Sequence, residues 1–208
     1  MEGEDALALL PTGGGKSICF QVPALMNPGI CIVISPLIAL IKDQVSNLQE
    51  RGIKALSVTS ELDASGLDAV FDRCIYEEDV KFLYLSPERL KTDLAKQRIP
   101  QMNVNLIAVD EAHCISEWGY DFRPPYLEIA EVRPLIPNAP VLALTASATP
   151  MVVKDIQERL HFKKPNLFQK SFERENLSYF IDWNEDKLGK IERIAKKQNG
   201  SGIIYVRS

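Results

Sequence analysis

The chain has 208 residues, of which 46% are hydrophobic and 25% are charged, and its formal net charge at pH 7 is -4. This composition excludes a wholly disordered protein, and the length allows one full hydrophobic core with residues left over. The negative net charge excludes a globally basic surface, so a nucleic-acid partner would have to bind a local patch.

Neither a membrane segment nor a cysteine metal site is indicated. The longest apolar run, residues 30–41, is broken by Pro36 and followed by Lys42, and it is too short to span a bilayer. The N-terminus is acidic and does not resemble a signal peptide. The four cysteines are widely spaced without a Cys-x-x-Cys pair. We therefore expect a cytoplasmic protein with reduced, mostly buried thiols, no zinc site and no membrane partner.

Short apolar segments alternate with stretches of helical spacing over most of the chain. The predicted strands are residues 5–10, 29–35, 54–58, 81–86, 104–109 and 140–145. The predicted helices follow the glycine-lysine-serine segment through Leu25, cover 36–51 and the region around 67–76, follow the strand 81–86 through Leu94, and run from 150 through Leu160. This alternation predicts an α/β fold with a doubly wound, mainly parallel sheet.

The pattern loosens into a connector at residues 165–177. Two further predicted strands, 179–183 and 202–206, flank a lysine-rich helix over 187–198. Because the chain stops directly after a predicted strand, we expect a first domain over 1–178 and the truncated start of a second domain over 179–208.

A glycine-rich segment joins the first predicted strand to the first predicted helix. Glycines let backbone N–H groups approach phosphate oxygens, and the N-terminus of the following helix adds partial positive charge. In such a phosphate-binding loop the lysine reaches the β- and γ-phosphates and the serine hydroxyl binds Mg²⁺. Leu10 stands where the strict pattern has glycine, so an ordinary glycine-rich turn remains an alternative. The candidate nucleotide-binding residues are Thr12, Gly13, Gly14, Gly15, Lys16 and Ser17.

Acidic residues follow the predicted strand 104–109, in the order Asp110-Glu111-Ala112-His113. Ligands of doubly wound sheets bind at the carboxyl ends of the strands, where the phosphate-binding loop also lies. Asp110 can hold Mg²⁺ together with Ser17, and Glu111 can orient or deprotonate an attacking water. The alternative is an acidic strand end that caps the next helix. The glycine-lysine-serine segment upstream favours a nucleoside triphosphate site.

Together the motifs resemble those of the RecQ family of superfamily 2 DNA helicases, in the same order over the whole chain. Residues 10–24 are similar to motif I, 35–45 to motif Ia, 84–90 to motif Ib, 112–126 to the aromatic-rich loop, 144–149 to motif III, 172–177 to the interdomain junction and 202–207 to the start of motif IV. The aromatic-rich loop is the specific feature, because motifs I to III alone would fit many related helicases.

The resemblance implies a RecA-like P-loop NTPase domain, ATP and Mg²⁺ as ligands, and movement 3′ to 5′ along DNA in repair and recombination. The implied catalytic residues are Lys16, Glu111 and His113, with His113 sensing the γ-phosphate. The candidate DNA-binding or coupling residues are Ser35, Lys42, Gln44, Trp118, Phe122, Arg123, Thr145 and Ser147. Aromatic faces beside an arginine are typical of single-strand binding. The alternative for Trp118 and Phe122 is that they are core aromatic residues. The alternative for Ser35, Lys42 and Gln44 is that they cap and solvate a helix. The alternative for Thr145 and Ser147 is that they are ordinary loop hydroxyls.

Three departures from the family pattern affect the expected activity. The chain begins after the family's adenine-contacting glutamine motif, and it lacks most of the second RecA-like domain with its arginine finger and the C-terminal modules. Tyr120 stands where many members have histidine. We therefore expect weak ATP binding and slow hydrolysis by this chain alone. If the protein is bacterial, the resemblance implies association with the nucleoid. The alternatives are another superfamily 2 motor, such as an RNA helicase or a translocase, and a catalytically incompetent nucleotide- or DNA-binding module.

Overall fold

The structure is a computed structural model that describes residues 3–59, 62–119, 121–171 and 176–206. The chain divides into two compact units, residues 1–172 and residues 173–208. The expected boundary at 178/179 stays a prediction.

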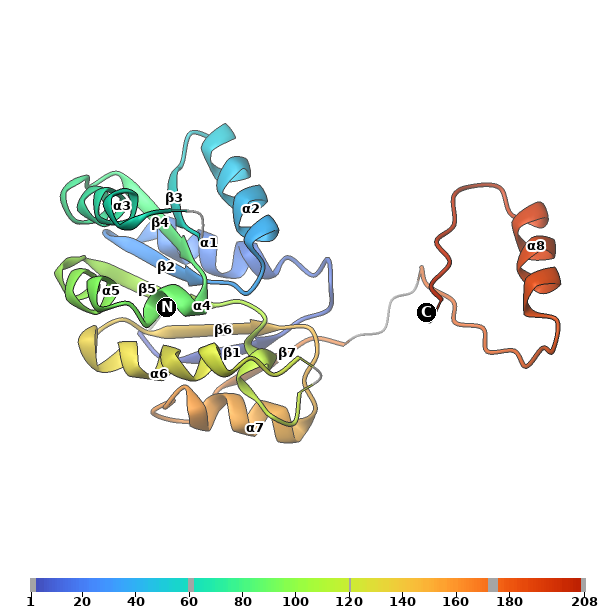
Figure 1. Cartoon of the computed structure of the whole chain (residues 1–208). Helices are drawn as coiled ribbons and strands as arrows, with labels where there is room; N and C mark the ends of the chain where they lie inside the picture. Colours follow the sequence, from blue (N-terminus) through green and yellow to red (C-terminus); the bar gives the residue numbers. More distant parts are fainter. Residues whose placement is uncertain (1–2, 60–61, 120, 172–175, 207–208) are drawn as a thin grey trace. The chain divides into compact units, whose positions relative to one another are not determined.

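The described part of the first unit contains a seven-stranded sheet in the order β3-β4-β2-β5-β6-β1-β7 (Figure 1). All of its strand pairs are parallel. The strands are β1 (Ala6–Leu9), β2 (Ile30–Ile34), β3 (Lys54–Val58), β4 (Val80–Leu85), β5 (Val104–Val109), β6 (Val141–Thr145) and β7 (Leu167–Gln169). The predicted α/β fold and its first six strands are thereby confirmed.

Helices cover both faces of the sheet (Figure 1). Helices α1 (Lys16–Met26) and α2 (Ile38–Glu50) pack on one face. The other face carries α3 (Ala64–Tyr76), α4 (Pro87–Leu90), α5 (Asp93–Arg98), α6 (Ile129–Val132) and α7 (Pro150–Arg159). Short 3₁₀ helices lie at Ile99–Gln101, Ala112–Ile115, Pro124–Glu128 and Arg133–Leu135.

The central strands are apolar throughout because both of their faces are covered. In β2, Ile32 and Ile34 join the core beneath α3 to α7, whereas Cys31 and Val33 join the core beneath α1 and α2. Alternate side chains of a strand point to opposite faces, so a continuous apolar run supplies both cores.

One strand of the sheet was missed by the sequence analysis. The short strand β7 lies inside the predicted connector 165–177 and pairs with β1 at the edge of the sheet. Its three residues are all exposed, with Phe168 61% exposed. An exposed three-residue edge strand has no hydrophobic pattern that distinguishes it from a loop.

In the second unit the predicted helix is confirmed as α8 (Lys187–Lys197), and Asp186 caps its N-terminus. The two strands predicted at 179–183 and 202–206 are wrong, because both segments are irregular in the structure. Their large apolar side chains are exposed, including Phe180, Trp183 and Tyr205. Among the described residues they have no neighbouring strand, and an isolated strand leaves its backbone groups unpaired.

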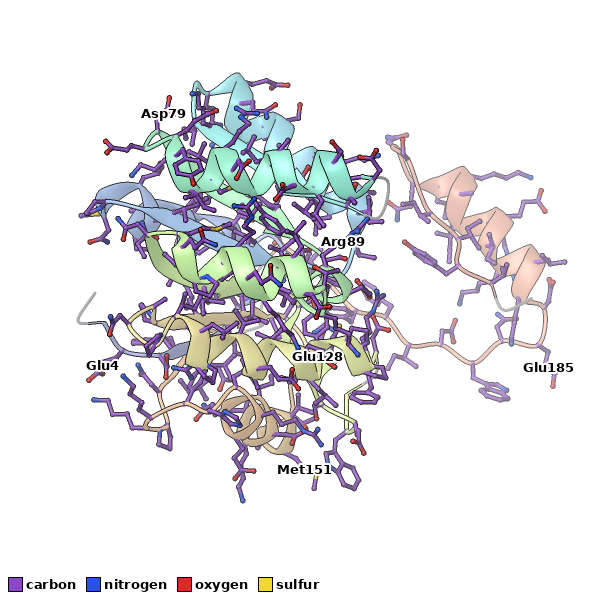
Figure 2. The ribbon with its side chains drawn as sticks, turned by 60° about the vertical axis from the view of Figure 1, so that its left-hand side comes forward. Glu4, Asp79, Arg89, Glu128, Met151 and Glu185 are labelled. Carbon is purple, nitrogen blue, oxygen red and sulfur yellow. The ribbon has the colours of Figure 1, made fainter. Side chains whose placement is uncertain are left out.

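The two ends of the sheet strands face opposite edges of the first unit. Figure 2 shows Glu4 and Asp79, which precede β1 and β4, at one edge, and Arg89, which follows β4, toward the other. Within the described parts of the chain, every helix is too short or too polar to cross a membrane.

Candidate active site

Three neighbouring strands bring the predicted nucleotide-site residues together. In the strand order β5-β6-β1, Leu9 is in register with Thr145, and Val109 is in register with Ala143. The carboxyl ends of these strands are therefore level and adjacent. The glycine loop leaves β1, the acidic segment leaves β5, and Thr145 ends β6.

The glycine loop has a backbone that other residues would strain. Gly13 and Gly15 have φ angles of 77° and 81°, in the left-handed region that favours glycine. A Cβ atom on Gly14 would lie 2.8 Å from the Pro11 carbonyl oxygen. Leu10, the departure from the strict pattern, has no positive φ and donates its backbone N–H to Thr145 O at 3.0 Å. The departure therefore leaves the geometry of the loop intact.

Lysine, glutamate, histidine and threonine side chains form a continuous chain of contacts. Lys16 Nζ lies 3.7 Å from Glu111 Oε1, and His113 Nδ1 lies 3.3 Å from Glu111 Oε2. His113 Nδ1 is also 2.8 Å from Thr145 Oγ1, and the Ser147 backbone N–H donates to that hydroxyl at 3.1 Å. The chain of contacts connects the glycine loop to the loop after β6. All three predicted catalytic residues, Lys16, Glu111 and His113, are thus brought together.

The two carboxylates of the acidic segment have opposite electrostatic environments. Burial, with the negative charge of Glu111, raises the pKa of Asp110 above its ordinary value. The hydrogen bond from His113, assisted by Lys16, holds the pKa of Glu111 below its ordinary value. Glu111 also has a φ of 46°, a left-handed conformation that costs a non-glycine residue about 1–2 kcal/mol. Strain of this kind is often retained where function requires it.

Asp110 is held rigidly at the end of β5. Its backbone N–H donates to Ile34 O at 2.9 Å, and its carbonyl oxygen accepts from the hydroxyl of the fully buried Tyr126 at 2.9 Å. The fully buried Ser35 hydroxyl lies beside its carboxyl. A buried carboxylate next to a hydroxyl, at the same end of the sheet as a glycine loop, is a donor set that fits a hard divalent cation with phosphates.

The candidate DNA-contact residues divide into exposed and buried groups. Trp118 is 67% exposed, while Phe122 and Arg123 are half-buried in the same loop. Arg123 donates to Asp121 Oδ2 at 3.2 Å and to Pro36 O at 3.2 Å, which ties the aromatic loop to the segment after β2. Tyr120 lies outside the described residues.

The remaining candidates lie on α2 and at the strand ends. Lys42 is exposed, and Gln44 is half-buried and accepts from the Tyr84 hydroxyl at 3.0 Å. Ser147 is exposed, whereas Thr145 is fully buried. Ser35 is also fully buried, and its side chain lies beside the Asp110 carboxyl.

Two structural supports of the site could not be predicted from the sequence. Tyr126 ends the aromatic-rich motif, and its hydroxyl donates to the Asp110 carbonyl oxygen. Asp5 anchors the start of β1 through an ion pair with Arg133, 128 positions further along the chain. No pattern of spacing marks contacts of this range; the only available signal was a charged residue at the start of an apolar strand.

Comparisons with known proteins agree with this geometry. The family model described as "DEAD/DEAH box helicase" matches residues 1–156. An ATP-dependent DNA helicase RecQ of Haemophilus influenzae is 41% identical over all of this chain, which covers 34% of that protein. The Bacillus subtilis RecQ is 44% identical over 97% of this chain and 34% of its own length. A RecQ-like DNA helicase BLM of Xenopus laevis is 41% identical over 99% of this chain and 16% of its own length. The chain thus spans about a third of the length of its bacterial relatives.

Solved structures share the fold at lower identity. The helicase MrfA has a TM-score of 0.69 at 17% identity, covering 94% of this chain and 32% of its own. The Pyrococcus furiosus Hef helicase domain has a TM-score of 0.62 at 22% identity, and the match covers 80% of this chain and 35% of the Hef chain. The RecA-like fold and the resemblance to RecQ helicases are confirmed, and the chain belongs to the DEAD/DEAH box helicase family.

Proposed function

We propose that this chain is the ATP-binding motor domain of a RecQ-type helicase, which couples ATP hydrolysis to 3′-to-5′ movement along DNA and strand separation in the cytoplasm. The observation that carries the proposal is the contact chain from Lys16 through Glu111 and His113 to Thr145, at the end of the sheet that also holds the glycine loop. Relatives named as RecQ DNA helicases over the full chain support DNA as the substrate in preference to RNA.

The residues of the site suit the steps of phosphate transfer. Lys16 pairs with Glu111 in the structure. Phosphate oxygens bound in the glycine loop would compete for the lysine, because they carry more negative charge than one carboxylate. Glu111 would then lose one of its two cationic or donor partners and be available to orient water and accept its proton. The low pKa of Glu111 keeps it ionised for this role at neutral pH.

Mg²⁺ in this site would neutralise charge on the bound phosphates, and Ser17 and Asp110 are the residues that would hold it. Burial raises the pKa of Asp110, and the positive charge of Lys16 offsets this effect only in part. A cation bound there would offset the cost of burying the Asp110 charge.

The contact between His113 and Thr145 supplies a route for coupling. Thr145 Oγ1 lies 2.8 Å from the histidine ring and accepts the Ser147 N–H, so a movement of His113 alters the loop that leads to α7. His113 is also followed directly by the segment that leads to the exposed Trp118. We propose that these two connections transmit the state of the γ-phosphate to bound single-stranded DNA.

The first experiment measures ATP turnover by this chain with and without single-stranded DNA or RNA, together with nucleotide binding. We expect binding with slow turnover, since motors of this type complete the site with an arginine from a second domain. Lys16→Ala should abolish nucleotide binding, while Glu111→Gln should retain it.

Rapid turnover that survives Glu111→Gln would overturn the assignment of the water-activating residue. Stimulation by RNA without stimulation by DNA would favour another superfamily 2 motor. Lack of nucleotide binding by a folded wild-type chain would refute the proposed ATP site.

A further inference from the structure

A second group of potential ligands lies beside the hydrolysis residues, on the aromatic loop. His113, Cys114 and Asp121, called the loop cluster below, each offer one ligand atom, and these atoms all lie within 4.8 Å of one another. Cys114 Sγ is 3.8 Å from His113 Nε2 and 3.8 Å from Asp121 Oδ2. Paired cysteines, the usual sequence signal of a zinc site, do not mark this group, because it contains only one.

Two of these separations, 3.8 Å each, lie at the upper end of the range in a zinc site, and the third, between His113 and Asp121, is within 4.8 Å. Zinc binds sulfur at about 2.3 Å and nitrogen or oxygen at about 2.0–2.2 Å, and in a tetrahedral site its ligand atoms lie about 3.3–3.8 Å apart. The loop cluster therefore needs shifts of less than about 1 Å to close around an ion. Three protein ligands of mixed type leave a fourth position for water, and imidazole with thiolate favours zinc over magnesium.

The orientation of His113 is an independent indication of a ligand. Its Nδ1 atom faces the Glu111 carboxylate at 3.3 Å and the Thr145 hydroxyl at 2.8 Å. A carboxylate only accepts hydrogen bonds, so a neutral His113 ring would donate from Nδ1 and leave Nε2, which lies 3.8 Å from Cys114 Sγ, as the metal-binding nitrogen. Metal-binding histidines are commonly held in this way, with the second ring nitrogen donating to a carboxylate.

We propose that the loop cluster is a binding site for Zn²⁺ or a similar soft divalent cation, which links the hydrolysis residue His113 to the aromatic loop. Binding would release the Cys114 thiol proton to solvent and form bonds to Nε2, Sγ and Oδ2. It would also replace the ion pair between Asp121 and Arg123. Arg123 is a candidate DNA-contact residue, so occupancy of the site would change the loop that faces DNA.

The test titrates the metal-free chain with Co²⁺, which reports thiolate coordination and tetrahedral geometry by optical absorption, and then displaces it with Zn²⁺. We expect a cobalt-thiolate band that Zn²⁺ removes and Mg²⁺ does not. Cys114→Ser should abolish the band, and Asp121→Asn should weaken binding at least about tenfold. Cys19→Ser is the matched control, because Cys19 is the one more accessible thiol among the four cysteines.

Arg123→Gln gives a change in the opposite direction. It removes the cation that competes for Asp121 Oδ2, so Co²⁺ should bind more tightly than in the wild-type chain. Thermal unfolding of each variant separates loss of a ligand from loss of the fold, and Asp121→Asn tests the site if Cys114→Ser does not fold.

Several results would overturn the proposal: a folded wild-type chain without the band, a band that survives in Cys114→Ser, or one that is lost in Cys19→Ser. Weaker binding by Arg123→Gln would contradict the geometry. None of these readings uses ATP turnover, so the metal site and the proposed motor function can fail independently.

Discussion

The buried ion pair between Asp5 and Arg133 should be a large single contribution to the stability of the first unit. Asp5 is 6% exposed, and both of its carboxylate oxygens accept from Arg133 Nη2 at 2.9 Å. The carboxylate also accepts from the Val141 and Lys163 backbone N–H groups, at 2.9 and 3.3 Å. The pair therefore joins the start of β1 to the start of β6 and to the segment before β7.

We expect Asp5→Asn to lower the free energy of unfolding by about 3 kcal/mol. Removing one partner of a buried pair costs about 3–5 kcal/mol, because the remaining charge is left uncompensated. We use the lower end of this range, because the remaining Arg133 charge keeps hydrogen bonds from its Nη1 to the Leu160 and His161 carbonyl oxygens, at 2.5 and 2.7 Å. With a urea m value of about 2 kcal/mol per M, the unfolding midpoint should fall by about 1.5 M.

The assay is urea unfolding followed by far-ultraviolet circular dichroism. Glu4→Gln is the matched control, since Glu4 pairs with Lys164 at 2.5 Å while 41% of its side chain is exposed, and such a pair contributes less than about 1 kcal/mol. In a double-mutant cycle with Arg133→Met, the double variant should be less destabilised than the sum of the single variants. Equal losses in Asp5→Asn and Glu4→Gln would refute the reasoning.

The remaining predictions concern the site. At pH 7, Asp110→Asn should raise the melting temperature, because burial raises the pKa of Asp110 and its charged form costs stability; the gain should vanish as the pH falls below about 3.9, where the unfolded carboxyl is also protonated. Glu111→Gln should lower the melting temperature at pH 7, because the pKa of Glu111 is depressed in the folded chain. The stability that ionised Glu111 contributes is complete above about pH 4.3 and is lost as the pH falls through its folded-state pKa. Shifts of the same sign in Asp110→Asn and Glu111→Gln would contradict this assignment. Thr145→Val removes both hydrogen bonds of a buried hydroxyl and should lower the free energy of unfolding in urea by about 1–3 kcal/mol. DNA-stimulated ATP turnover should fall more than nucleotide affinity. Unchanged stimulation by DNA would refute the coupling route. Trp118→Ala should change stability by less than about 0.5 kcal/mol but weaken single-strand binding by about 1–3 kcal/mol in fluorescence anisotropy, whereas Trp183→Ala, at an exposed indole in the second unit, should not affect binding.

Local sequence determined the elements and the chemistry of the site. Apolar runs such as 30–34 identified the buried strands, because a strand covered on both faces has no polar positions. The glycine loop and the acidic segment each follow a strand directly, so their placement at one edge of a parallel sheet could be predicted from the chain order.

The order of the strands was decided only by tertiary packing. The adjacency of β5, β6 and β1 brings His113 within 2.8 Å of Thr145, 32 positions further along the chain, and nothing in either segment encodes that contact. The same holds for Asp5 with Arg133 and for Cys114 with Asp121. The predicted strands 179–183 and 202–206 failed for the corresponding reason, since a strand forms only with a partner whose backbone groups it can pair. Local patterns specify which residues are apolar or reactive, whereas long-range pairing decides which of them meet.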